Sequence, residues 1–116
     1  MPRRRIAYAA AAGLAAVAAG CGGSSTGTQT HRQLTPEQQR GKEIFILKCG
    51  SCHTLSDAGT HGIVGKNLDV TKPSYATVLR TLAVPPKNMP SNLVTNAADA
   101  KAVAAYVAAV TGGAGP

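Results

Sequence analysis

Residues 49–53 read Cys-Gly-Ser-Cys-His, a C-x-x-C-H stretch on which the interpretation of the whole chain depends. Two thiols at this spacing can reach the two vinyl groups on one side of a porphyrin, and His53 then falls under the iron. The pattern is typical of covalent attachment of a c-type haem through Cys49 and Cys52. Small residues between the thiols allow the backbone to lie close along the haem edge. We therefore predict a haem site here, with His53 as an axial ligand.

Two other interpretations of this stretch are weaker. A thioredoxin-like redox pair requires a βαβ context, which the sequence does not offer. A structural zinc site requires a second pair of ligands, and only His31 and His61 remain to supply one.

The amino-acid composition leaves a core that needs a further component. Only 3% of the 116 residues are aromatic, with one Phe, three Tyr and no Trp. Long connections marked by Gly and Pro span 54–72 and 83–94, and the aromatic rings left to hold them are only those of Phe45, Tyr75 and Tyr106. Domains of this size commonly depend on a metal, a cofactor or disulfides for stability. A haem in the middle of the fold would supply the missing core.

The first predicted helix begins after Thr35. The run Thr-Pro-Glu-Gln at 35–38 places a capping hydroxyl, a Pro at the first helical position and a Gln three residues after the cap. The helix can extend to Lys48 and carry three apolar side chains inward: Ile44, Phe45 and Leu47. Gly41 lies one turn before Phe45, which suggests that another helix packs closely at that point.

Two further helices are predicted, and no stretch alternates as a strand. Thr95 or Asn96 can cap the last helix, whose apolar residues recur at spacings of three and four: Val103, Tyr106, Val107 and Val110. A shorter helix is expected over 74–81, directly after Pro73. The predicted fold class is therefore all-α.

The N-terminal third is interpreted as a targeting and linking segment. Arg3–Arg5 precede the apolar stretch 6–19, which is too short to cross a bilayer, so residues 1–20 are predicted to be a signal peptide. Residues 18–21, Ala-Ala-Gly-Cys, resemble the lipobox of bacterial lipoproteins, with Ala18 where Leu is preferred. The resemblance implies a lipid on Cys21; a plain secretory signal is the alternative. Residues 21–33 would form the lipidated N-terminus and a flexible tether, residues 34–111 the folded domain, and residues 112–116 a disordered tail.

The charge distribution excludes one class of partner. The formal net charge is +7, but Arg3–Arg5 lie together in the predicted signal peptide. No later basic run occurs and no aromatic platform accompanies the lysines, so we expect no nucleic-acid binding. The chain is also too short to form a long enzyme cleft.

Four motifs in order resemble the small mono-haem cytochromes c of class I. Residues 41–45 followed by the C-x-x-C-H stretch resemble the family's first helix, residues 65–68 its G-P-x-L loop, Met89-Pro90 its ligand loop and residues 103–107 its last helix. The resemblance implies the small cytochrome c fold, with three to four helices wrapped around one haem c bound through two thioethers. Lys66 stands where the family usually has Pro, whose carbonyl accepts the Nδ1 proton of the haem histidine. A Lys carbonyl can accept the same proton, but the loop loses stiffness.

The sixth ligand is expected to be Met89, because the only other methionine is Met1 in the predicted signal peptide. Pro90 biases Met89 towards an extended backbone. The alternatives are that Met89 fills space beside the haem or that His61 is the ligand. The site residues predicted around the haem are Lys66, Asn67 and Leu68, together with Tyr75 and Arg80 as candidate partners of the propionates.

These residues indicate a one-electron carrier and not an enzyme. His/Met ligation closes the iron to oxygen and peroxide, whereas a displaceable sixth ligand would indicate a peroxidase or gas sensor instead. The expected partners are redox proteins: a quinol-oxidising complex, a terminal oxidase or a secreted dehydrogenase. Lysines near the haem segments, at 42, 48, 66 and 87, could steer acidic partners or be scattered solvated residues. We expect a monomer outside the cytoplasm, held at the outer face of the cytoplasmic membrane, or in the periplasm, by lipidated Cys21.

Overall fold

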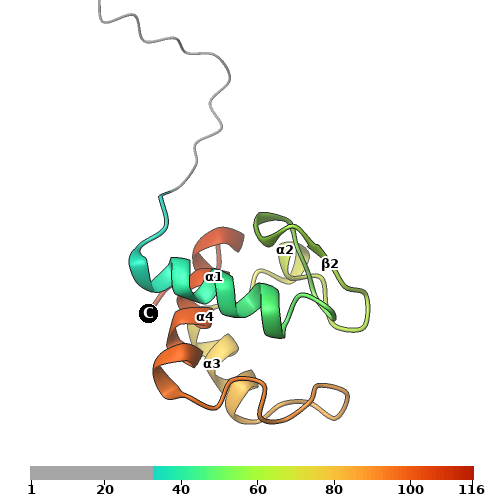
Figure 1. Cartoon of the computed structure of the whole chain (residues 1–116). Coiled ribbons are helices and arrows are strands. Elements are labelled where there is room, and N and C mark those ends of the chain that lie inside the picture. Colours follow the sequence, from blue (N-terminus) through green and yellow to red (C-terminus); the bar gives the residue numbers. More distant parts are fainter. Residues whose placement is uncertain (1–32) are drawn as a thin grey trace, which may run out of the picture. The chain divides into compact units, whose positions relative to one another are not determined.

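A computed structural model describes residues 33–116 of the chain (Figure 1). The predicted signal peptide, Cys21 and nearly all of the predicted tether lie outside these residues. The elements, in order, are α1 (Pro36–Lys48), β1 (Thr54–Leu55), η1 (Ser56–Ala58), β2 (Thr60–His61), α2 (Leu68–Thr71), α3 (Tyr75–Ala83) and α4 (Ala97–Thr111). The prediction of a helical fold is confirmed. Within the described part of the chain, no helix combines the length and apolarity that a membrane crossing requires.

Local capping signals explain where the longer helices begin. The Thr35 hydroxyl accepts a hydrogen bond from the Gln38 amide at 3.2 Å, and the Gln38 side chain accepts one from the Thr35 amide at 3.0 Å. This reciprocal pair satisfies two backbone donors that the first turn of α1 leaves free. Asn96, rather than Thr95, caps α4, because its side-chain oxygen accepts from the amides of Ala98 and Asp99.

The core lies where α1 crosses α4. Gly41 is buried at the crossing, and a Cβ atom there would overlap the Ala102 carbonyl and lie 2.8 Å from Cβ of Tyr106. One turn later, the rings of Phe45 and Tyr106 pack edge to face, with centroids 6.1 Å apart. The close approach of another helix at Gly41 is thus confirmed. Arg40 and Asp99 pair at 2.6 Å across the same crossing.

Replacing Gly41 with Ala should destabilise the protein. A helix-interior Ala gains about 1 kcal/mol over Gly, but overpacking a core costs about 3 kcal/mol when the neighbouring atoms cannot move. The atoms facing Gly41 are mainly backbone, so we expect a net loss of about 2 kcal/mol. Denaturant unfolding would measure it. Gly115→Ala is the matched control, since a Cβ there meets nothing within 4 Å. Equal denaturant midpoints for the Gly41→Ala and Gly115→Ala variants would contradict the close contact of Gly41 with α4.

The connection between Thr54 and Thr71 contains short elements that the sequence pattern did not predict. β1 and β2 pair antiparallel, with Thr54 opposite His61 and Leu55 opposite Thr60, and Leu55 is fully buried. Strands of two residues are too short to show an alternating pattern. This small hairpin packs beside the crossing of α1 and α4.

Leu47 does not face inward as predicted. It is 80% exposed, because it follows buried Phe45 by two residues and therefore lies on nearly the opposite side of α1.

Two residues of the segment predicted to be a disordered tail, 112–116, make backbone contacts before and at the start of α3. The Ala114 carbonyl accepts a hydrogen bond from the Tyr75 amide at 2.8 Å, and Gly113 packs against the backbone of Pro73. Gly112 turns the chain at the end of α4 with a φ of 80°. The tail packs through its backbone, which a search for apolar side chains does not detect. The Ala114 carbonyl thereby satisfies the Tyr75 amide, a backbone donor that has no partner within the first turn of α3.

Candidate functional site

The C-x-x-C-H stretch forms a turn directly after α1. The Cys52 and His53 amides both donate to the Cys49 carbonyl, at 3.1 and 3.0 Å. Cys49 is buried beside Phe45 and Tyr106, whereas Cys52 is half-buried, and both thiols are free. Burial, with a smaller effect of Cys52, raises the pKa of the Cys49 thiol to about 11. The turn therefore carries two thiols that form no disulfide, together with the His53 ring, within five residues.

The His53 ring is oriented by one backbone carbonyl. Its Nδ1 lies 2.8 Å from the oxygen of Lys66. A carbonyl oxygen only accepts hydrogen bonds, so the proton is on Nδ1 and the lone pair is on Nε2. Such a contact fixes the tautomer and ring orientation of a metal-ligating histidine and increases its basicity. His53 thus has Nε2 available as a donor atom for a metal.

Two glycines allow the loop carrying Lys66 to lie against the C-x-x-C-H turn. A Cβ atom on Gly65 would come within 2.5 Å of the His53 ring, and one on Gly62 within 2.6 Å of the Cys52 amide nitrogen. The Gly65 amide also donates to the Cys52 carbonyl at 2.7 Å. Any side chain at either position would push the loop away from His53. These roles of Gly62 and Gly65 were not predicted, although the G-x-x-G spacing after the motif was an available signal.

Hydrogen bonds from two threonines connect the hairpin to the C-x-x-C-H turn and to the start of the loop that carries Lys66. The Thr60 hydroxyl donates to the His53 carbonyl and the Thr54 hydroxyl to the Gly62 carbonyl, each at 2.9 Å. His61, the rival ligand, lies exposed on β2.

The remaining predicted site residues lie on separate elements. Met89 is half-buried in the connection between α3 and α4, where its amide donates to the Pro86 carbonyl at 2.9 Å. Asn67 caps α2, and Leu68 packs against the core. The candidate propionate partners lie on α3, Tyr75 at its first residue and Arg80 in its last turn.

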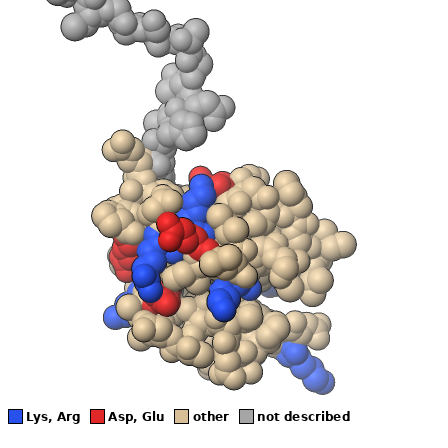
Figure 2. Space-filling view, in the orientation of Figure 1, with Lys and Arg blue, Asp and Glu red and all other residues tan. Residues whose placement is uncertain are grey.

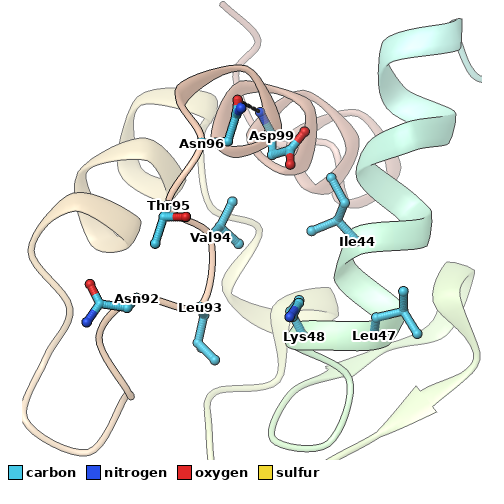
Figure 3. A pocket seen from close by; sticks show the side chains of 9 residues that line it. All are labelled: Ile44, Leu47, Lys48, Asn92, Leu93, Val94, Thr95, Asn96 and Asp99. Carbon is cyan, nitrogen blue, oxygen red and sulfur yellow. Dashed lines mark hydrogen bonds between the residues drawn. The ribbon is translucent and has the colours of Figure 1, made fainter.

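Two cavities lie near the start of α4. The first, of about 300 Å³, is surrounded by side chains from the second half of α1 and from residues 92–96, including Ile44, Leu93 and Val94 (Figure 3). The second, of about 280 Å³, lies between α3 and the start of α4. Neither is lined by His53 or Met89. The candidate site is therefore identified by its donor atoms and not by a cavity. Among the residues that the structure describes, no three His, Cys, Asp or Glu side chains gather as a further metal site would require.

Charged side chains are unevenly distributed on the face shown in Figure 2. They gather over α1, whereas the part of this face over β2 carries none. Lys42 pairs with Asp57 at 3.2 Å, so this lysine is partly neutralised. The loop before Lys66 also exposes two apolar side chains, Ile63 (92% exposed) and Val64 (70% exposed). They add to the neutral character of the segment beside His53.

Comparison with known proteins identifies the family. No protein-family model matches the chain. Among solved structures, the c-type cytochrome SorU from Sinorhizobium meliloti is 37% identical, with a TM-score of 0.62, and the match covers 69% of this chain and 97% of that one. The chain belongs to the c-type cytochromes.

The donor set of this cytochrome fits a covalently bound haem. Free thiols on one turn are the groups that form thioethers, and the adjacent His53 has its Nε2 lone pair available. When bound, the haem supplies a single, reversible oxidation step at its iron. The Lys66 carbonyl orients the ring of His53. The loop can lie this close because Gly62 and Gly65 have no side chains.

Proposed function

We propose that this cytochrome is a class I mono-haem electron carrier with His53 and Met89 as axial ligands. One haem c would be held through thioethers to Cys49 and Cys52. The observation that supports this assignment best is the hydrogen bond between His53 Nδ1 and the Lys66 carbonyl, because it leaves Nε2 as a ligating atom beside two free thiols. Haem-based electron transfer agrees with the family of its structural neighbour.

Met89 is the proposed sixth ligand because its thioether is the softest donor outside the C-x-x-C-H turn among residues 33–116. It is half-buried, and Pro90 follows it. Thioether ligation raises the reduction potential, and a filled sixth position leaves no place for oxygen or peroxide. The rival His61 is exposed on β2 and opposite Thr54. A carrier therefore accounts for these residues better than a peroxidase or gas sensor does.

Visible spectra of the reduced protein, with and without carbon monoxide, test the proposal in one sample. We expect the bands of a thioether-linked haem that are unchanged by carbon monoxide. A protein that keeps covalent haem but shifts its bands at once with carbon monoxide would favour the sensor or peroxidase alternative. A protein without covalent haem would contradict both.

The proposed location is the outer face of the cytoplasmic membrane, through lipidated Cys21. A diacylglyceryl group supplies two acyl chains, which makes a stable anchor, whereas one chain binds only marginally. The tether of residues 21–33 would keep the haem at high effective concentration near membrane complexes. The proposed partners are a quinol-oxidising complex, a terminal oxidase or a secreted dehydrogenase. Lys42 is paired with Asp57, so steering of acidic partners would fall mainly to the exposed Lys48, Lys66 and Lys87.

Replacing Cys21 with Ser should release the protein from the membrane without changing its haem. The substitution removes the thiol that accepts the lipid and lies outside the folded domain. Fractionation and visible spectra would show a soluble extracytoplasmic protein with the wild-type spectrum. Ser25→Ala serves as the control in the same segment and should stay with the membrane. Retention of the Cys21→Ser variant in the membrane fraction would place the anchor elsewhere.

A further inference from the structure

The hairpin after the C-x-x-C-H turn is fixed to both long helices through Asp57. The hydroxyl of fully buried Tyr106, on α4, donates to Asp57 Oδ2 at 2.6 Å. Lys42, on α1, pairs with the same oxygen at 3.2 Å. The pKa of Tyr106 is raised by burial and by its bond to Asp57, so its hydroxyl remains a donor. The hairpin is thereby a fixed support beside His53.

The residue before Asp57 connects this support to the loop that carries Lys66. Asp69 Oδ2 accepts from the Ser56 amide at 2.9 Å and from the Ser56 hydroxyl at 2.8 Å. His53 and Lys66 are 13 residues apart in sequence, and so are Ser56 and Asp69. The two contacts therefore join the same pair of segments three residues apart. Two contacts side by side restrain a loop against rotation, whereas one contact alone allows the loop to turn about it.

The restraint lies where no ring stiffens the loop. Residue 66 is Lys and not Pro, so its backbone φ is not fixed by a ring. On one side of it, Gly65 is held by its amide bond to the Cys52 carbonyl. On the other side, the Asn67 side chain accepts from the Asp69 amide at 3.0 Å, which sets Asp69 towards Ser56. The Lys66 carbonyl is thus held from both sides.

We propose that Asp69 and Ser56 are positioning residues that hold the Lys66 carbonyl on His53 Nδ1, in a loop segment that no proline ring stiffens. This inference rests on the proposed role of His53 as the haem ligand. It assigns a function to two residues outside the haem motifs, acting through Lys66 and not on the haem itself.

The test measures hydrogen exchange of the His53 Nδ1 proton by NMR in the reduced, haem-loaded protein. Asp69→Ala should speed the exchange about tenfold, equivalent to ~1.4 kcal/mol, and should raise the reduction potential, because the imidazole becomes less basic when its donor bond weakens. The matched control is Asp99→Ala, which removes another carboxylate in an ion pair, at the α1–α4 crossing. It should lower thermal stability and leave both readouts unchanged.

Introducing a proline at residue 66 provides the decisive experiment. Within residues 33–116, the Lys66 amide donates no hydrogen bond, so Lys66→Pro removes none. In the Lys66→Pro background, Asp69→Ala should change the exchange rate less than twofold. The assignment is overturned if Asp69→Ala leaves the exchange rate and the reduction potential unchanged, as Asp99→Ala should. It is also overturned if Asp69→Ala speeds the exchange as much in the Lys66→Pro background as in the wild type. Should Asp69→Ala fail to retain haem, Ser56→Ala removes only the hydroxyl bond and should give a smaller rise in the exchange rate. No rise in that variant would also overturn the assignment.

The outcome is separable from that of the proposed function. If the wild-type protein shows no covalent haem, or its Nδ1 proton is not seen because His53 is not the ligand, the proposed function fails. If the wild-type spectra are those of a His-ligated c-type haem and only the variants behave otherwise, the positioning role alone fails.

Discussion

The Cys49→Ala/Cys52→Ala variant should lose covalent haem and, with it, most of its helical circular dichroism. A small domain has a net stability of only about 5–15 kcal/mol, and the aromatic residues of this core are limited to Phe45 and Tyr106. The haem is expected to contribute much of the remaining apolar contact, so its loss should exceed that margin. Far-UV circular dichroism and a denaturing gel stained for haem would measure both effects.

Single variants separate haem loss from damage to the core. Cys49 is 6% exposed and packs in the core, whereas Cys52 is half-buried, so Cys49→Ala also removes a packed sulfur. Cys52→Ala should keep one thioether and most of the helical signal. A double variant that remains helix-rich and well folded would contradict the view that the haem completes the core.

Met89→Ala should open the iron to external ligands. The thioether no longer competes for the sixth position, so the apparent affinity for carbon monoxide should rise on the order of 100-fold, which is ~2.7 kcal/mol. The reduction potential should fall, because a soft ligand that favours the reduced iron is replaced by water or another harder donor. Carbon monoxide titration and spectroelectrochemistry would measure the two changes.

His61→Ala is the matched control for the ligand assignment. His61 is exposed on β2, so its removal should change neither carbon monoxide binding nor the potential. The opposite pattern, with an effect of His61→Ala and none of Met89→Ala, would transfer the sixth-ligand role to His61. A wild type that already binds carbon monoxide as the Met89→Ala variant does would replace the carrier by the sensor or peroxidase alternative.

The long helices could be predicted because their determinants are local. Thr35 and Gln38 lie within one turn of each other, and Gly41 lies one turn from Phe45, so the start of α1 and its contact face are visible in a short window. The helical fold was predicted from such short windows. It is confirmed by the structure and by its similarity to a solved c-type cytochrome. The C-x-x-C-H turn is equally local.

Contacts between distant segments could not be predicted in the same way. Tyr106 and Asp57 are 49 residues apart. Ser56 bonds to the carboxylate of Asp69, which belongs to no recognisable sequence motif. The two-residue strands offer too few positions for a pattern. Gly113 and Ala114 pack through backbone atoms, which composition alone does not reveal. The contact between His53 and Lys66 was expected only from a resemblance to a family, since nothing local to either residue indicates it.

The crossing of α1 with α4 also has a consequence for the order of events in the export that we propose. Gly41 meets Ala102, and Arg40 meets Asp99 across 59 residues, so the partner of the first helix is the last one. A chain that leaves a translocation channel N-terminus first cannot close its core until α4 has emerged. Throughout that passage Cys49, which the folded core buries, stays accessible on an open chain. For a chain exported as we propose, pairing the first helix with the last would therefore delay closure of the core, and the two thiols would be available for haem attachment during that time.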